Sequence, residues 1–73
     1  MAKRTYYILS GEGTGEGNWR KLDTTDRGIK CVLTRERCGG DRWVRAYYAI
    51  GNDPNTGIDV ESGEARHLPG SLT

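Results

Sequence analysis

Two adjacent glycines near the middle of the chain, Gly39 and Gly40, separate two segments in which apolar and polar residues alternate. Both glycines can adopt φ > 0, as the two-residue turns between antiparallel strands require. Pairing outward from this turn aligns residues 29–38 with residues 41–50 and gathers the apolar side chains on one face. That face carries Ile29, Cys31, Leu33, Val44, Ala46, Tyr48 and Ile50. The sequence therefore predicts a β-hairpin over residues 29–50, with Cys31 in the core.

An α-helix over residues 26–38 is the alternative for the first of these segments. Asp26 would cap it, apolar residues recur at helical spacing, and Gly39 would follow its last turn. Gly28 near the start and several β-branched residues oppose a helix, and we therefore prefer the strand. Residues 43–50 form a strand under either interpretation, because they are rich in aromatic and branched side chains.

The first third of the chain predicts a strand followed by a loop. Residues 5–10 are apolar on both faces of a strand, which is typical of a central position in a small curved sheet. Residues 11–18 have glycine at every second position and offer little for side-chain packing, so we expect a flexible loop. Residues 19–22 form either a brief strand or one helical turn.

The last third predicts a turn and a second hairpin. Residues 51–57 have the composition of a turn, with proline between aspartate and asparagine. Residues 58–68 form a hairpin around Ser62 and Gly63, in which Asp59 faces Arg66 and Ile58 faces His67. Residues 69–73 are expected to be a frayed tail.

The length and composition of the chain limit the fold class. With 73 residues, of which 34% are apolar, residues 1–73 form a single small domain with a thin core. We expect a mainly β fold: a curved antiparallel sheet or an SH3-like barrel of four or five strands, with one short helix allowed. An α+β fold with residues 26–38 helical is the alternative. A homodimer or a large partner would supply the burial that so small a core lacks.

The charge and the apolar runs restrict the cellular setting and the partners. Eleven basic and ten acidic residues give a net charge of +1, which weakens the case for generic phosphate binding. No apolar run reaches the length of a secretory signal or a membrane span, so a cytoplasmic location with reduced thiols is expected. Cys31 and Cys38, seven positions apart on one strand, would be too distant for a disulfide.

No group of residues has the pattern of a catalytic or metal site. Cys31, Cys38 and His67 are the soft metal ligands of the chain, and no CxxC-type spacing joins them. The Gly-rich loop lacks the lysine and the following helix of a phosphate-binding loop. We therefore predict a protein that is not an enzyme and has no metal or cofactor.

The polar face of the predicted hairpin has the composition of a binding surface. It carries Trp43, Arg45, Tyr47 and Lys30, while further arginines lie near the hairpin tip: Arg35, Arg37 and Arg42. Tryptophan, tyrosine and arginine dominate protein interfaces, so we predict a module that docks on a larger protein as an adaptor or inhibitor. Aromatic and arginine side chains on a sheet also bind single-stranded nucleic acid, which is the alternative. By analogy alone, such small proteins are often encoded by phages or mobile elements. Whether this face is exposed or covered by the chain itself is left open by the sequence.

Overall fold

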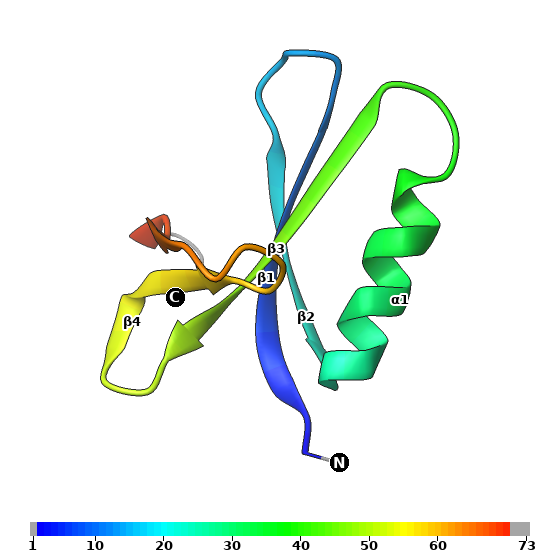
Figure 1. Cartoon of the computed structure of the whole chain (residues 1–73). Helices are drawn as coiled ribbons and strands as arrows, with labels where there is room; N and C mark the ends of the chain where they lie inside the picture. Colours follow the sequence, from blue (N-terminus) through cyan, green and yellow to red (C-terminus); the bar gives the residue numbers. More distant parts are fainter. Residues whose placement is uncertain (1, 71–73) are drawn as a thin grey trace.

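The computed structural model of the chain describes residues 2–70, which form one antiparallel sheet and one helix (Figure 1). In chain order the elements are β1 (Arg4–Glu12), β2 (Asn18–Thr24), α1 (Asp26–Arg37), β3 (Arg42–Ile50), β4 (Asp53–Asp59) and β5 (Ala65–His67). The five strands lie in the order β2-β1-β3-β4-β5. The sheet is open, so the predicted mainly β fold with a short helix is confirmed as a curved sheet and not as a barrel.

Strand β1 lies inside the sheet, between β2 and β3, as its two apolar faces predicted. Tyr6 and Ile8 are buried on the face that α1 covers, and Tyr7 and Leu9 are buried on the opposite face. The two apolar faces thus belong to two separate clusters of buried side chains. Residues 19–22, for which a helical turn was the other interpretation, belong to β2.

Residues 26–37 form helix α1, and the predicted β-hairpin over residues 29–50 is therefore wrong. The Thr25 hydroxyl caps the helix by accepting a hydrogen bond from the Gly28 backbone N–H at 3.1 Å. Ile29 and Leu33 lie one turn apart and are buried against the sheet. In the sheet, β1 pairs with one edge of β3 from Arg42 to Tyr48, and β4 pairs with the other edge from Tyr47 to Ile50. Residues 26–37 pack on the face of the sheet and pair with neither edge.

The helix changes the surroundings of both cysteines. Cys31 lies on the exposed side of α1, so its predicted place in the core is wrong, and Cys38 follows the last turn of α1. Both are exposed free thiols. Ile50, which was assigned to the same apolar face, is also exposed. In contrast, Val44 and Ala46 are buried beneath α1 as expected.

Glycines that counted as evidence for a hairpin or against a helix have other roles. Gly39 and Gly40 do adopt φ > 0, at +94° and +77°, but they join α1 to β3 and not two strands. A Cβ atom at Gly28 would lie 2.1 Å from Thr24 Oγ1. Glycine therefore stands at this helical position because the end of β2 approaches it closely.

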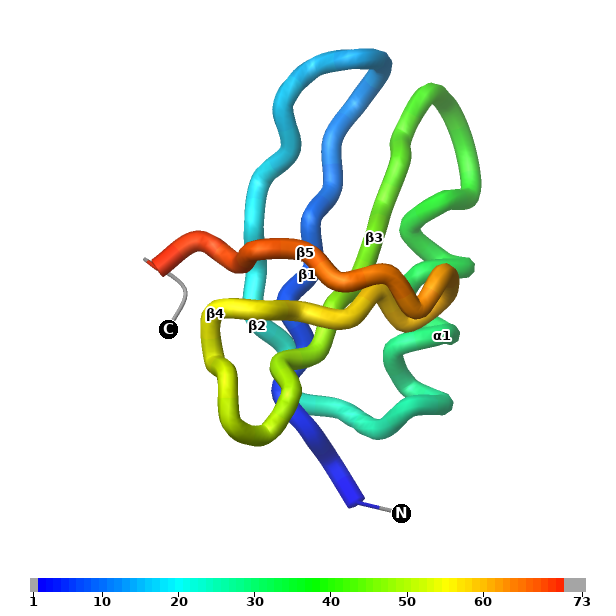
Figure 2. Tube along the Cα trace, turned by 60° about the vertical axis from the view of Figure 1, so that its left-hand side comes forward, coloured from blue at the N-terminus to red at the C-terminus, as the bar shows by residue number. Residues whose placement is uncertain are grey.

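The sheet is buried on both faces. Helix α1 covers one face, whereas β4 and β5 run across the other side of β1 and β3 (Figures 1 and 2). Leu68, just after β5, is fully buried against Tyr7, Leu9 and Tyr47. A Cβ at Gly57 would meet both Leu68 and Tyr47 below 3.0 Å, so glycine allows this close packing. The end of the described chain thus completes a second core.

The second hairpin is present, but its predicted register is wrong by two residues. Ile58 pairs with Ala65 and not with His67. Asp59 determines the tighter pairing, because its carboxylate accepts the backbone N–H groups of Glu61 and Ser62 at 2.8 and 3.1 Å and so shapes the loop.

The predicted turn over residues 51–57 is shorter than expected. Only Gly51 and Asn52 form the turn, and the residues from Asp53 onward belong to β4. Asp53 nevertheless accepts the Asn55 N–H at 3.0 Å, the local contact that this composition favours. Of the predicted tail, residues 71–73 lie outside the described part of the chain.

Candidate functional site

The face of the sheet opposite α1 contains an open cleft of about 570 Å³. We call it the Trp-Arg cleft. Its walls are Trp19, Trp43, Arg45, Arg66 and residues 15–17 of the Gly-rich loop. Leu9 of β1 also lines it, so four strands and one loop contribute side chains or backbone to a single concave surface.

The two tryptophans are half-buried and form the apolar walls of the cleft. Trp43 packs on the backbone of the Gly-rich loop: a Cβ at either Gly11 or Gly17 would lie 2.7 Å from a carbon of its indole ring. The backbone of the loop thus packs, although its glycines bring no side chains. The Gly13 N–H also donates to the Asp41 carbonyl at 3.0 Å, which ties the loop to the turn before β3.

Arg66 lies beside two aromatic rings at the edge of the cleft. Its guanidinium carbon is 5.6 Å from the ring centroid of Trp19 and 5.8 Å from that of Tyr47. Its Nη1 donates to the Tyr47 hydroxyl at 3.3 Å. The predicted pairing with Asp59 is wrong, and within residues 2–70 no carboxylate forms an ion pair with Arg66. The aromatic rings hold this guanidinium in place while its charge is left without an acidic partner from the described chain.

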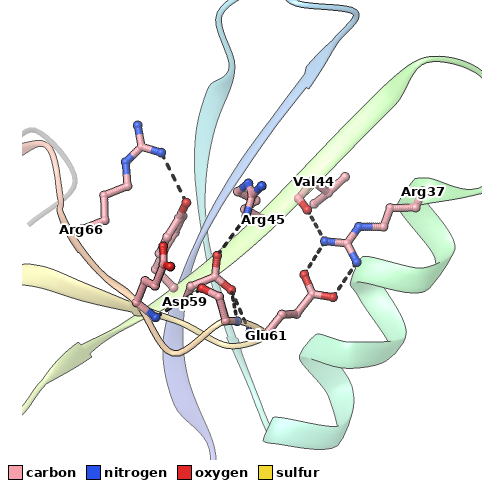
Figure 3. A network of polar contacts seen from close by, with 9 residues as sticks. Arg37, Val44, Arg45, Asp59, Glu61 and Arg66 are labelled. Atoms are coloured by element: carbon pink, nitrogen blue, oxygen red, sulfur yellow. Dashed lines mark hydrogen bonds and ion pairs between the residues drawn. The ribbon is translucent and has the colours of Figure 1, made fainter.

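Arg45 is the cation that Asp59 does pair with, at 3.4 Å between Nη1 and Oδ2 (Figure 3). Asp59 is only 4% exposed, whereas the Arg45 side chain is 55% exposed. Arg45 therefore offsets the charge of a buried carboxylate with one nitrogen and remains accessible at the cleft. Arg45 and Arg66 also line a second depression of about 370 Å³, so they stand between two neighbouring hollows.

The structure divides the predicted face of Trp43, Arg45 and Tyr47 into a covered and an open part. Tyr47 is 3% exposed and belongs to the second core. Trp43 is half-buried, and Arg45 is exposed. Because β4, β5 and Leu68 cover only part of this face, the other part forms the Trp-Arg cleft.

The predicted basic tip is not a cluster of free charges. Arg37 donates to both carboxylate oxygens of Glu61, at 2.5 and 2.7 Å, and to the Val44 carbonyl at 2.5 Å (Figure 3). The bond from Arg37 lowers the pKa of the Glu61 carboxyl, and Glu61 in turn raises the pKa of Arg37. This pair fastens the end of α1 to the loop between β4 and β5.

The other predicted basic residues also lie outside the cleft. Arg42 donates to Glu36 at 3.2 Å, and Glu36 also accepts from Arg20 at 2.6 Å. Hydrogen bonds from Arg20 in particular hold the pKa of Glu36 below its usual value. Lys30 and Arg35 lie on the exposed side of α1. Of the seven predicted binding residues, the structure brings Trp43, Arg45 and Tyr47 together and separates the rest.

The sequence does not place Trp19 and Arg66 on this face, because they lie on β2 and β5 at opposite edges of the sheet. Only the curvature of the sheet brings them together. The sequence offered one signal for including Trp19 and Arg66 in the site, namely that tryptophan and arginine are enriched at binding sites.

Metal-ligating clusters and membrane-spanning helices are absent from the part of the chain that the structure describes. Within residues 2–70, no three His, Cys, Asp or Glu side chains are placed to hold a metal ion. No helix in the same range is long and apolar enough to cross a membrane. Comparison of the chain with protein-family models, with curated proteins and with solved structures finds no match.

Proposed function

We propose that this protein is a non-enzymatic binding module that docks on a larger protein through the Trp-Arg cleft, as an adaptor or inhibitor. The observation that carries the proposal is the cleft itself: two half-buried tryptophans and two accessible arginines around one hollow. Residues of these types in concave, partly desolvated positions supply most of the binding energy of protein interfaces. A cytoplasmic location, where both thiols stay reduced, and a phage or mobile-element origin are parts of the proposal that rest on composition and analogy.

The charges favour a polypeptide over single-stranded nucleic acid as the partner. Binding to a phosphate backbone depends on several free cations along one surface. Here Arg37, Arg42 and Arg45 are each paired with a carboxylate, and Glu16 lines the cleft itself. The aromatic walls are thus better supported as a site for side chains of a protein than as a track for phosphates.

Selection from a displayed library of random peptides tests the proposal. We expect the protein to enrich specific peptides, and ¹⁵N–¹H correlation spectra to place them at the indole N–H groups of Trp19 and Trp43 and at residues 15–17. Arg66→Glu should change their affinity at least tenfold, because it replaces a side chain that lines the cleft and reverses its charge. Arg35→Glu is the matched control, since it makes the same change at an exposed position on α1.

Two outcomes would contradict the proposal. One is that no peptide is enriched, or that the enriched peptides shift resonances of α1 and not of the cleft. The other is that octathymidylate binds the cleft with an affinity that falls steeply with salt while peptides do not bind. The second outcome would establish the nucleic-acid function instead.

A further inference from the structure

We infer that the Trp-Arg cleft takes an acidic polypeptide segment, in which an Asp or Glu carboxylate pairs with Arg66 and a neighbouring apolar side chain lies between Trp19 and Trp43. This inference rests on the proposed docking function and adds the chemical class of the partner.

The carboxylate site follows from the state of Arg66. A guanidinium has five N–H donors in a planar fork that matches a carboxylate, and one of those of Arg66 goes to the Tyr47 hydroxyl. The guanidinium lies beside the rings of Trp19 and Tyr47, whose centroids are 5.7 Å apart, and these contacts restrict the Arg66 side chain before a ligand binds. Within residues 2–70 its charge has no carboxylate partner. An acidic side chain from outside would supply one, in the two-pronged geometry that arginine favours.

Arg45 extends the positive region beyond Arg66. Both arginines line the Trp-Arg cleft and the adjacent smaller depression. A single contact of 3.4 Å joins Arg45 to Asp59, whose other oxygen is occupied by backbone N–H groups. Much of the Arg45 guanidinium therefore stays available beside Arg66. Glu16 also lines the cleft, and Asp59 and Glu64 line the smaller depression, so we expect the carboxylate of the ligand at the two arginines and not along the whole of either hollow.

The apolar part of the ligand follows from the other walls. Leu9, Trp19 and Trp43 line the cleft beside Arg66. Gly17 keeps the loop close to Trp43, so that loop backbone and the indole ring bound this side of the hollow. An apolar or aromatic residue next to the carboxylate would bury its surface here, at roughly 25 cal/mol per Å² removed from water.

Two capped peptides test the carboxylate: acetyl-Glu-Phe-Glu-amide and its neutral counterpart acetyl-Gln-Phe-Gln-amide, each added at millimolar concentration to ¹⁵N-labelled protein. We expect saturable shifts of both indole N–H groups with the Glu peptide. The Gln peptide should bind about tenfold more weakly, because a charge-assisted pair is lost. Arg66→Gln should reduce the affinity for the Glu peptide to that level, and Arg35→Gln should leave it unchanged. Arg66→Lys, which keeps the charge and loses the fork, should fall between them.

Equal affinity for the two peptides, or no saturable shift in the cleft with the Glu peptide, would overturn the inference. Its failure is distinct from failure of the docking function. If the peptides selected from a random library occupy the cleft but are neutral or basic, the docking function stands and the acidic partner is wrong. If no selected peptide occupies the cleft, both are wrong.

Discussion

Truncation of Leu68 to alanine tests whether the residue after β5 completes a second core. Leu68 is fully buried, and Leu68→Ala removes three carbon atoms from contact with Tyr7, Leu9 and Tyr47. At about 0.8 kcal/mol per buried methylene, with a further cost for the cavity, we expect a loss of about 3 kcal/mol in the free energy of unfolding. The backbone N–H of residue 68 still donates to the Asn55 carbonyl in the variant, so the loss reports the side chain.

Urea unfolding followed by tryptophan fluorescence measures this loss, since Trp19 and Trp43 both pack against the same cluster. In a thermal scan, the midpoint should fall by about 12–24 °C for a domain of this size. Ile50→Ala is the control, because Ile50 is a large apolar residue that is 39% exposed, and it should cost less than about 1 kcal/mol. A loss for Leu68→Ala below about 1 kcal/mol, or one equal to that of the control, would refute the second core.

Three further predictions concern the helix and its attachments. Gly28→Ala should lower the midpoint of thermal denaturation, because the new Cβ would collide with Thr24 Oγ1. In an unobstructed helix the same change raises the free energy of unfolding by about 1 kcal/mol. In a Thr24→Ala background, where the obstacle is removed, Gly28→Ala should therefore be stabilising. Glu61→Gln should be less stable than the wild type at pH 6, and the difference should disappear as the pH falls below about 4. The reason is that the hydrogen bond from Arg37 lowers the pKa of Glu61 in the folded state, so protonation of Glu61 removes the stabilisation. Equal urea midpoints for the two proteins at pH 6 would show that the ion pair contributes nothing. Burial and the hydrogen bond to the Asp26 carboxylate raise the pKa of Tyr6 to about 12. An absorbance titration should therefore show a phenol that ionises near pH 12, and this step should be absent in Tyr6→Phe. The stability that this raised pKa contributes is complete below pH ~10 and is lost as the pH approaches 12.

Local patterns predicted strands correctly where the apolar side chains on each face of the segment are buried in the folded sheet. Residues 5–10 and 43–50 form strands as expected, since their apolar side chains are buried on two faces of one sheet. The apolar residues of 29–38 fit the spacing of a strand and that of a helix, and Gly28 together with several β-branched residues favoured the strand. The true reason for that glycine is its contact with Thr24, which no local pattern contains.

The candidate site was predictable in part for the same reason. Trp43, Arg45 and Tyr47 share the face of one strand, so alternation alone groups them. Arg66 and Trp19 come from the two edges of the sheet, and only its curvature brings them to the same cleft. The free or paired state of each arginine depends on carboxylates far away in the chain, such as Glu61 for Arg37.

Local sequence patterns were sufficient to predict a small, mainly β fold, because the alternation of side chains along a strand is a property of a few neighbouring residues. The tertiary structure alone decided that residues 26–37 are helical, that Leu68 is core and that the cleft has an unpaired arginine within the described chain. The physical reason is that each of these depends on contacts between residues far apart in the chain: α1 packs on the sheet, Leu68 on Tyr7 and Leu9, and Arg66 beside Trp19 and Tyr47. A local sequence pattern does not contain such contacts.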